Sequence, residues 1–225
     1  MNKKSIFITG TGTDVGKTFV SSLLLKELMQ HGVQVGYFKP VLSGAQNING
    51  ELHAGDCEYV INKSGLSQNP LESASYIFED AVSPHLAAKN AGVKIDKNVI
   101  LKDFQSYKKD FIVVEGAGGI TCPLELDTES YLISNLIKDL ALDVVIVADA
   151  GLGVINAVLL TLEYAKNHGI KVRGVILNKF VKNSSMYLDN LKTIETLGNT
   201  KVIGLVEINA QNVEWLISDI KEIFN

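Results

Sequence analysis

The sequence predicts an α/β fold with three layers, in which a mostly parallel sheet of about seven strands has helices on both faces. The first observation behind this prediction is that short β-branched runs alternate with amphipathic stretches of helical length, which is the pattern of βα units. The second is that most of these runs are apolar along their whole length, so both faces of the sheet are covered. Because no linker divides the 225 residues, we expect a single domain over 1–225.

Each element follows from the same patterns. The predicted strands are residues 5–9, 33–38, 111–115, 143–148, 172–177 and 201–206, with a further run of strand type at 74–79. The predicted helices are residues 17–30, 131–142, 155–167 and 184–197. The polar, Gly- and Asn-rich stretch 41–55 is predicted to be a long loop of functional importance, and the amphipathic segment 213–224 is expected to pack on the sheet as a helix.

Composition excludes several classes of function. The chain has 21 Lys and Arg against 25 Asp and Glu, so we expect no nucleic-acid partner. No apolar run approaches the roughly 18 residues of a membrane span, and the run after Met1 is too short for a signal-peptide core, so we expect a cytoplasmic protein without a membrane partner. Cys57 and Cys122 are far apart and form no C-x-x-C pair, which argues against a disulfide framework and a structural zinc site.

A phosphate-binding loop follows the first predicted strand. The string G-T-G-T-D-V-G-K-T at 10–18 leads directly into an apolar helix, although Thr11 stands where the strict G-x-x-x-x-G-K-[ST] pattern has its first glycine. In such a loop Lys17 reaches the β and γ phosphates, and the hydroxyl of Thr18 ligates Mg²⁺. We therefore expect a P-loop NTPase-like fold that binds a nucleotide through Gly12, Thr13, Asp14, Val15, Gly16, Lys17, Thr18 and Phe19.

Two carboxylates are candidate metal ligands near this loop. Glu115 ends a predicted strand immediately before G-A-G-G at 116–119, at the edge where open α/β sheets bind ligands. Asp56 follows the polar stretch 41–55, and its alternative interpretation is a simple helix cap.

Two further polar residues end predicted strands at the same edge. Lys39 closes the second strand and, together with Lys17, would suit a second anionic group in line with the γ phosphate. Asn178 opens a string similar to N-K-x-D, but Val181 replaces the acid that reads guanine. Adenine is therefore favoured, with Asn178 as the reader of the base.

Taken together, the motifs resemble those of the dethiobiotin synthetase family. The resemblance rests on 10–18, Y-F-K-P-V-L-S-G at 37–44, S-P-H at 83–85, V-E-G-A-G-G at 114–119, G-V-I-N at 153–156 and Asn178. It implies an ATP- and Mg²⁺-dependent ligase of biotin biosynthesis that converts 7,8-diaminononanoate and CO₂ to dethiobiotin. In such enzymes a substrate carbamate attacks the γ phosphate, and the second amine closes on the mixed anhydride.

The resemblance also implies residue roles. Lys17, Lys39 and Thr13 would be catalytic, and Thr18, Asp56 and Glu115 would hold Mg²⁺. Glu115, Gly118 and Asn178 would complete the nucleotide site. The substrate set is Lys39, Ser43, Gly118, Gly119, Gly153, Val154, Asn156 and Tyr187.

The resemblance further implies a homodimer with its active sites at the subunit interface. The last four of these substrate residues would contribute to the active site of the other subunit. There the start of a helix near Gly153 would hold the substrate carboxylate. The alternative for Asn156 is a plain helix cap.

Two departures from the family pattern and two alternative functions stay open. Asp14 stands where the family often has Glu, and residues 206–210 replace a Pro-containing stretch that follows the last strand. One alternative is the nucleotide-binding subunit of a cobyrinate-type amidotransferase, which needs a separate glutaminase chain. The other is a deviant P-loop switch ATPase, whose extra signature lysine would fall at Gly12.

Overall fold

The computed structural model describes residues 4–127 and 130–224. Residues 1–3, which begin the segment predicted to be too short for a signal peptide, lie outside the described residues. Within this part of the chain, seven strands form a central sheet in the order β13-β12-β11-β10-β1-β7-β2. Only β13 is antiparallel among these described strands. The strands are β1 (Lys4–Gly10), β2 (Val35–Phe38), β7 (Phe111–Gly119), β10 (Val144–Asp149), β11 (Val172–Asn178), β12 (Val202–Val206) and β13 (Glu214–Trp215).

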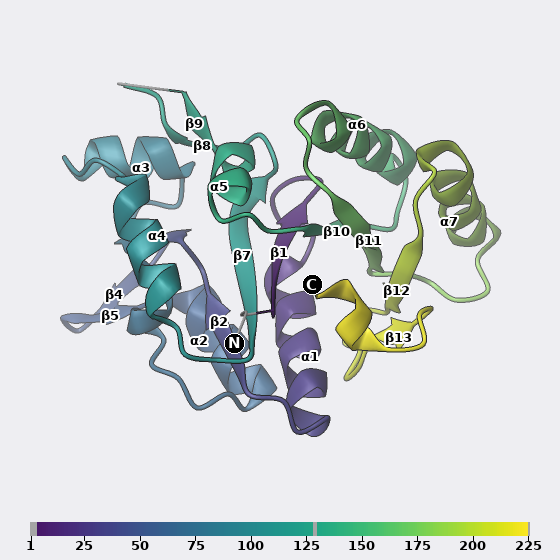
Figure 1. Ribbon diagram of the computed structural model, residues 1–225, viewed down its shortest axis with the longest axis horizontal. Helices are drawn as coiled ribbons and strands as arrows, with labels where there is room; N and C mark the ends of the chain where they lie inside the picture. The colour runs from purple at the N-terminus through teal and green to yellow at the C-terminus, as the bar shows by residue number, and fades with distance from the viewer. Residues whose placement is uncertain (1–3, 128–129, 225) are drawn as a thin grey trace.

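Helices cover both faces of this sheet, as predicted (Figure 1). One face carries α1 (Lys17–Gln30) and α2 (Gly55–Ser64). The other carries α3 (Pro84–Asn90), α4 (Lys97–Ser106), α5 (Ile133–Asp139), α6 (Val154–Asn167) and α7 (Ser185–Gly198). Along β1, Ile6 and Ile8 pack in the core beneath α1, whereas Phe7 packs in the core on the opposite face. The uninterrupted apolar run of this strand therefore reflects burial from both sides.

Three two-stranded sheets lie beside the central one among the described residues. They pair β3 (Val41–Ser43) with β6 (Tyr76–Phe78), β4 (Gln46–Ile48) with β5 (Glu51–His53), and β8 (Pro123–Glu125) with β9 (Tyr131–Leu132). Two predictions are corrected here. The strand expected at 74–79 belongs to a small sheet, and 41–55 forms short strands instead of one loop. Strands of three residues are too short to show a reliable period in the sequence.

Two predicted helices also differ. The one expected at 131–142 begins only at Ile133, because Tyr131 and Leu132 pair with β8. The segment 213–224 forms β13 and a short 3₁₀-helix (Ile220–Ile223). Tertiary contacts explain this second difference, since Trp215 pairs with β12 and its indole Nε1 donates a 2.5 Å hydrogen bond to Glu27 on α1. The helices at α2, α3 and α4 and the 3₁₀ turn Leu71–Ser73 were not among the predicted elements.

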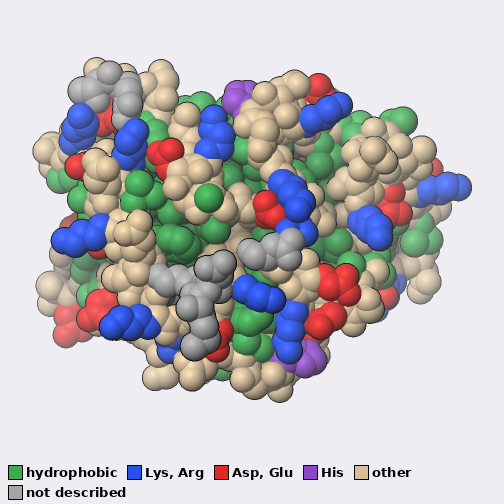
Figure 2. Space-filling view, in the orientation of Figure 1, with side chains coloured by type: hydrophobic (Ala, Val, Ile, Leu, Met, Phe, Trp, Pro, Cys, Tyr) green, Lys and Arg blue, Asp and Glu red, His purple; other side chains and the backbone are tan. Residues whose placement is uncertain are grey.

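The charged side chains on the surface are mixed in sign. On the face in Figure 2, basic and acidic side chains are interspersed. Within the described ranges, no helix combines the length and the apolar character that a membrane crossing requires.

Candidate active site

Residues 10–18 connect the end of β1 to the first turn of α1, as the sequence predicts. Gly16 has a φ of +91°, and a Cβ at this position would overlap the side-chain amide of Asn178. Only glycine meets both conditions. Asn178 in turn donates from Nδ2 to the carbonyl of Val15 over 2.9 Å. The loop is thus held in its curled shape by the end of β11.

Lys17 lies inside this curl. Its Nζ donates to the carbonyl of Gly12 over 2.9 Å, and its side chain is buried. Burial lowers the pKa of Lys17, while the nearby charge of Glu115 acts in the opposite direction. The ammonium group therefore lies in the loop, where a bound phosphate would offer it stronger acceptors than a backbone carbonyl.

A fully buried carboxylate, Glu115, accepts hydrogen bonds from side chains at the start of α1 and at the end of β2. Its Oε1 accepts from the hydroxyl of Thr18 at 2.8 Å and from Nζ of Lys39 at 2.9 Å. Its Oε2 accepts from the hydroxyl of Tyr37 at 3.0 Å. Asp56, on the first turn of α2, pairs with Lys39 from the other side. The predicted residues Lys17, Thr18, Lys39, Asp56 and Glu115 are therefore brought together.

The charges in this cluster are mutually dependent. Burial by itself lowers the pKa of Lys39, but the carboxylates of Glu115 and Asp56 outweigh burial and raise that pKa above its ordinary value. Lys39 is therefore a cation at physiological pH although it is almost fully buried. Burial, followed by the charge of Glu115, raises the pKa of Tyr37 well above its usual range, so its phenol stays protonated.

A cleft of about 920 Å³ is lined by Lys17, Thr18, Lys39, Asp56 and Glu115. Thr13, Phe19, Ser43 and Gly118 also line it. The hydroxyl of Ser43 is buried and has no hydrogen-bond partner among the described residues, so it has unused capacity toward a ligand. A Cβ on Gly119 would lie 3.2 Å from the carbonyl of Gly10, which shows how closely the end of β7, at 116–119, approaches the phosphate loop.

The oxygen atoms around Glu115 fit a hard divalent cation. Thr18 Oγ1 and Glu115 Oε1 are hydrogen-bonded at 2.8 Å, and the Asp56 carboxylate reaches the same group through Lys39. Hydroxyl and carboxylate oxygens are ligands that Mg²⁺ prefers. No group of three or more His, Cys, Asp or Glu side chains within 4–127 and 130–224 could hold a metal alone. Nucleotide oxygens and water would have to supply the other ligands.

The four residues predicted to serve a neighbouring subunit lie elsewhere. Gly153 and Val154 begin α6, Asn156 is exposed in the first turn of that helix, and Tyr187 lies on α7 with its ring against Phe180. None of the four is among the described residues that line the cleft. Within one chain, the structure does not bring them to the phosphate loop.

Comparison with known proteins agrees with this site. A family profile described as an AAA domain matches residues 4–214. A protein of Clostridium botulinum (strain Alaska E43 / Type E3), named ATP-dependent dethiobiotin synthetase, is 41% identical over 224 residues, which are 99% of this chain and 98% of that protein. Another of the same name from strain 657 / Type Ba4 is 46% identical over 189 residues, 83% of each chain. The chain belongs to the dethiobiotin synthetase family.

Solved structures outside the dethiobiotin synthetases share the fold. A ParA family ATPase from Chlorobium tepidum matches with a TM-score of 0.57 at 16% identity, over 92% of this chain and 85% of that chain. The signal recognition particle receptor FtsY from Elizabethkingia anophelis matches with a TM-score of 0.53 at 12% identity, over 99% of this chain and 65% of that chain. At such low identities the likeness establishes the P-loop NTPase fold and nothing about function.

Two residues, Tyr37 and Lys179, contact the dethiobiotin synthetase site but were missed by the sequence predictions. Tyr37 begins the motif at 37–44, but no role was predicted for it. A phenol in an otherwise apolar strand is a signal for a buried hydrogen bond. Lys179, next to Asn178, donates to Asp149 Oδ2 at 2.7 Å and to the carbonyl of Asp14 at 3.3 Å. Because the amide of Asn178 is bound to the phosphate loop, its predicted contact with the base stays a prediction.

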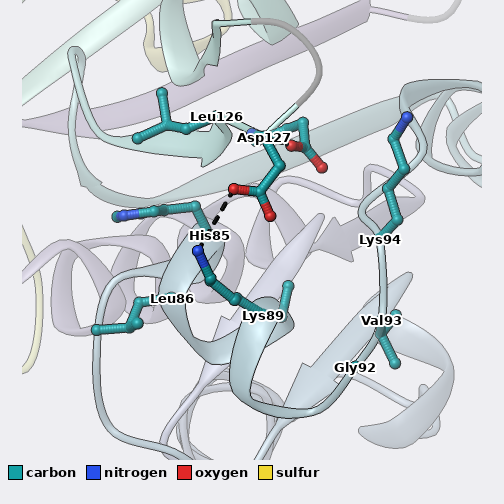
Figure 3. Close-up of a pocket in the computed structure, with 10 residues that line it drawn as sticks. His85, Leu86, Lys89, Gly92, Val93, Lys94, Leu126 and Asp127 are labelled. Atoms are coloured by element: carbon teal, nitrogen blue, oxygen red, sulfur yellow. Dashed lines mark hydrogen bonds and ion pairs between the residues drawn. The ribbon is translucent and has the colours of Figure 1, made fainter.

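A second pocket, of about 470 Å³, lies between α3 and β8 (Figure 3). Lys89 and Asp127 approach each other there at 3.6 Å, and Lys94 stands apart from this pair. None of the residues predicted for the dethiobiotin synthetase site lines it. The charged cluster and the phosphate loop therefore identify the larger cleft as the candidate active site.

Proposed function

We propose that this chain is an ATP-dependent dethiobiotin synthetase that acts as a single domain over 1–225 and uses ATP as co-substrate. It would convert 7,8-diaminononanoate and CO₂ to dethiobiotin, with release of ADP and phosphate. The observation that carries the proposal is the meeting of Lys17, Thr18, Lys39 and Glu115 in one cleft. The 41% identity to a named dethiobiotin synthetase over 99% of the chain supports it.

In this proposal the phosphate loop binds ATP. Residues 12–19 surround the phosphates, and Lys17 exchanges the carbonyl of Gly12 for phosphate oxygens, which are stronger acceptors. Asn178 bonds to the carbonyl of Val15 in the loop. It would also approach the base.

Lys39 and its neighbours bind the second anion, the substrate carbamate. Phosphoryl transfer asks the protein mainly for positioning and for neutralisation of charge, so no protein nucleophile is needed. Lys39 supplies a buried positive charge, and Thr13 and Ser43 supply hydroxyls that line the same cleft. Backbone amides at Gly118 and Gly119 would complete the carbamate site.

Mg²⁺ would be held by Thr18, Asp56 and Glu115. Its contribution when bound would be to neutralise charge on the transferring phosphate. What supports this assignment is the oxygen-rich set of donors around Glu115. Lys39, which now contacts both carboxylates, would then be free to turn toward the carbamate.

The substrate carboxylate would bind at the start of α6 in a second subunit, through Gly153, Val154, Asn156 and Tyr187. Two observations support a homodimer of this kind. These residues lie outside the cleft of their own chain, and exposed leucines lie on the same segments of the chain. Leu152 is 94% exposed, Leu160 63% and Leu188 52%. Exposed apolar side chains gathered on neighbouring elements mark an interface.

One assay tests the proposal. The purified protein is given ATP, Mg²⁺, 7,8-diaminononanoate and bicarbonate, and both ADP and the mass of the organic product are measured. We expect ADP and dethiobiotin in equal amounts. ATP turnover without a ureido product would reject the proposal. Stimulation by lipid vesicles would then favour a switch ATPase, and a glutamine-dependent product with a partner chain would favour an amidotransferase.

A further inference from the structure

The two oxygens of the Glu115 carboxylate accept hydrogen bonds from different sides, and Tyr37 is the partner of Oε2. Oε1 of Glu115 accepts from Thr18 and Lys39, and both of these line the cleft. Oε2 accepts from Tyr37, at 3.0 Å, and Tyr37 is not among the described lining residues of the cleft. The two oxygens therefore have different surroundings, one toward the ligand and one toward the core.

The environment makes this single hydrogen bond important. Both Tyr37 and Glu115 are 0% exposed, so water cannot replace the phenol if it is lost. A buried polar atom that loses its partner costs more than the net value of the bond, and bonds to charged groups are the stronger ones. Without the phenol, the carboxylate would gain by rotating its unpaired oxygen toward the cleft.

Tyr37 is itself held in place. The side chain of Gln68 accepts from the backbone N–H of Tyr37 at 3.2 Å and donates to its carbonyl at 2.6 Å. The hydroxyl of Tyr107 donates to the same carbonyl at 3.0 Å. The phenol is therefore delivered to Glu115 from a backbone that is fixed on the side away from the cleft.

We propose that Tyr37 is a positioning residue, which orients Glu115 so that Oε1 faces the phosphate loop and thereby sets the affinity for the complex of nucleotide with Mg²⁺. This inference rests on the proposed function, because it gives Glu115 a role at the metal. It assigns Tyr37 no direct contact with substrate. The pair joins β2 to β7 across the sheet, so the orientation comes from the core of the fold.

The test compares two phenol deletions in the full chain. Tyr37→Phe removes the donor to Glu115, whereas Tyr107→Phe removes an equivalent hydroxyl that contacts the backbone of Tyr37 and not Glu115. Binding of a non-hydrolysable ATP analogue is measured by calorimetry with Mg²⁺ and with EDTA, and the melting temperature is recorded for each variant.

We expect Tyr37→Phe to weaken binding in Mg²⁺ about tenfold, the scale of one hydrogen bond to a buried charge, and to leave binding in EDTA within about twofold. Tyr107→Phe should lower the melting temperature without this Mg²⁺-specific loss, because Gln68 still holds both the N–H and the carbonyl of Tyr37. In a Glu115→Gln background, Tyr37→Phe should cause no further Mg²⁺-specific loss.

Two outcomes would overturn the proposal: unchanged Mg²⁺-dependent binding in folded Tyr37→Phe, or the same loss in Tyr107→Phe. If Tyr37→Phe does not fold, Gln68→Leu decides, because it releases the backbone of Tyr37 and keeps the phenol. We expect it to weaken binding in Mg²⁺ about threefold, and no change would count against the role. None of these measurements needs the diamine, so failure to make dethiobiotin rejects the proposed function separately.

Discussion

The cleft at the phosphate loop and the start of α6 differ in how their side chains are paired and buried. In the cleft, Lys39, Asp56 and Glu115 are charged and pair with one another inside one chain. At the start of α6, Leu152 and Asn156 face outward. A buried charge must have its partners before the ligand arrives, because leaving it unpaired is costly. An exposed helix start has no such requirement. In the proposed homodimer, the nucleotide chemistry would therefore be prepared within one chain, while the far end of the substrate would depend on a surface from the other.

The largest effect should come from the two lysines of the cleft. We expect Lys17→Ala and Lys39→Ala each to lower kcat by on the order of a hundredfold, as loss of a donor aimed at developing charge does. Lys17→Ala should also weaken ATP binding, whereas Lys39→Ala should leave ATP affinity nearly unchanged. Steady-state kinetics and calorimetry separate the two. Lys102→Ala, an exposed lysine on α4, is the control. Near-normal turnover in Lys39→Ala would remove Lys39 from the catalytic set.

A somewhat smaller effect should follow from neutralising a carboxylate. Glu115→Gln keeps the shape of the side chain and removes its charge, so we expect activity to fall more than about tenfold and the remaining activity to depend only weakly on Mg²⁺. Asp56→Asn should do less, because the Asp56 side chain is 45% exposed whereas that of Glu115 is fully buried. Mg²⁺ titrations of kcat/KM measure both. A normal Mg²⁺ requirement in Glu115→Gln would mean that Glu115 only supports the end of β7 at 116–119.

The third prediction tests whether the start of α6 acts on another subunit. Lys17→Ala and Asn156→Ala dimers should each be impaired, but a mixed dimer has one site with Lys17 and Asn156 both intact, from different chains. Random exchange makes about half of the dimers mixed, so roughly a quarter of all sites should be restored. Activity after exchange, with exchange verified by mass, should therefore exceed the mean of the two parents. Activity equal to that mean would show that Asn156 acts within its own chain.

The smallest effect should come from the pair that connects the two regions. Lys179 bonds to Asp14 in the phosphate loop and to Asp149, whose Oδ1 accepts from the backbone N–H of Gly151 just before α6. Both side chains of the pair are 43% exposed, so solvent screens them, and we expect Lys179→Met to raise KM for ATP by no more than about fivefold. Asp149→Asn is the matched variant, since it keeps an acceptor for Gly151. A loss as large as that of Lys17→Ala would mean that the two regions form one site.

What the sequence predicts well is local. The phosphate loop is contiguous in the chain, and α1 covers the predicted residues 17–30, because a loop and a helix are specified by near neighbours. The contact between Tyr37 and Glu115 joins residues 78 positions apart. It exists because β2 and β7 are neighbours in the sheet, and no periodicity encodes strand order. The helix predicted at 213–224 was wrong for the same reason. Trp215 pairs with β12 and bonds to α1, and these distant contacts outweigh the local helical pattern.

The position of β1 has a consequence for how the chain reaches this fold in the cell. This strand leaves the ribosome before either of its neighbours in the sheet, because Phe7 pairs with Val114 on one side and Val144 on the other. At about 5–20 residues per second, these partners appear on the order of ten seconds later. During that interval the strand, with its apolar centre at residues 6–8, has open edges on both sides. The nascent chain is therefore most exposed to aggregation, and most in need of chaperones, before β10 has been made.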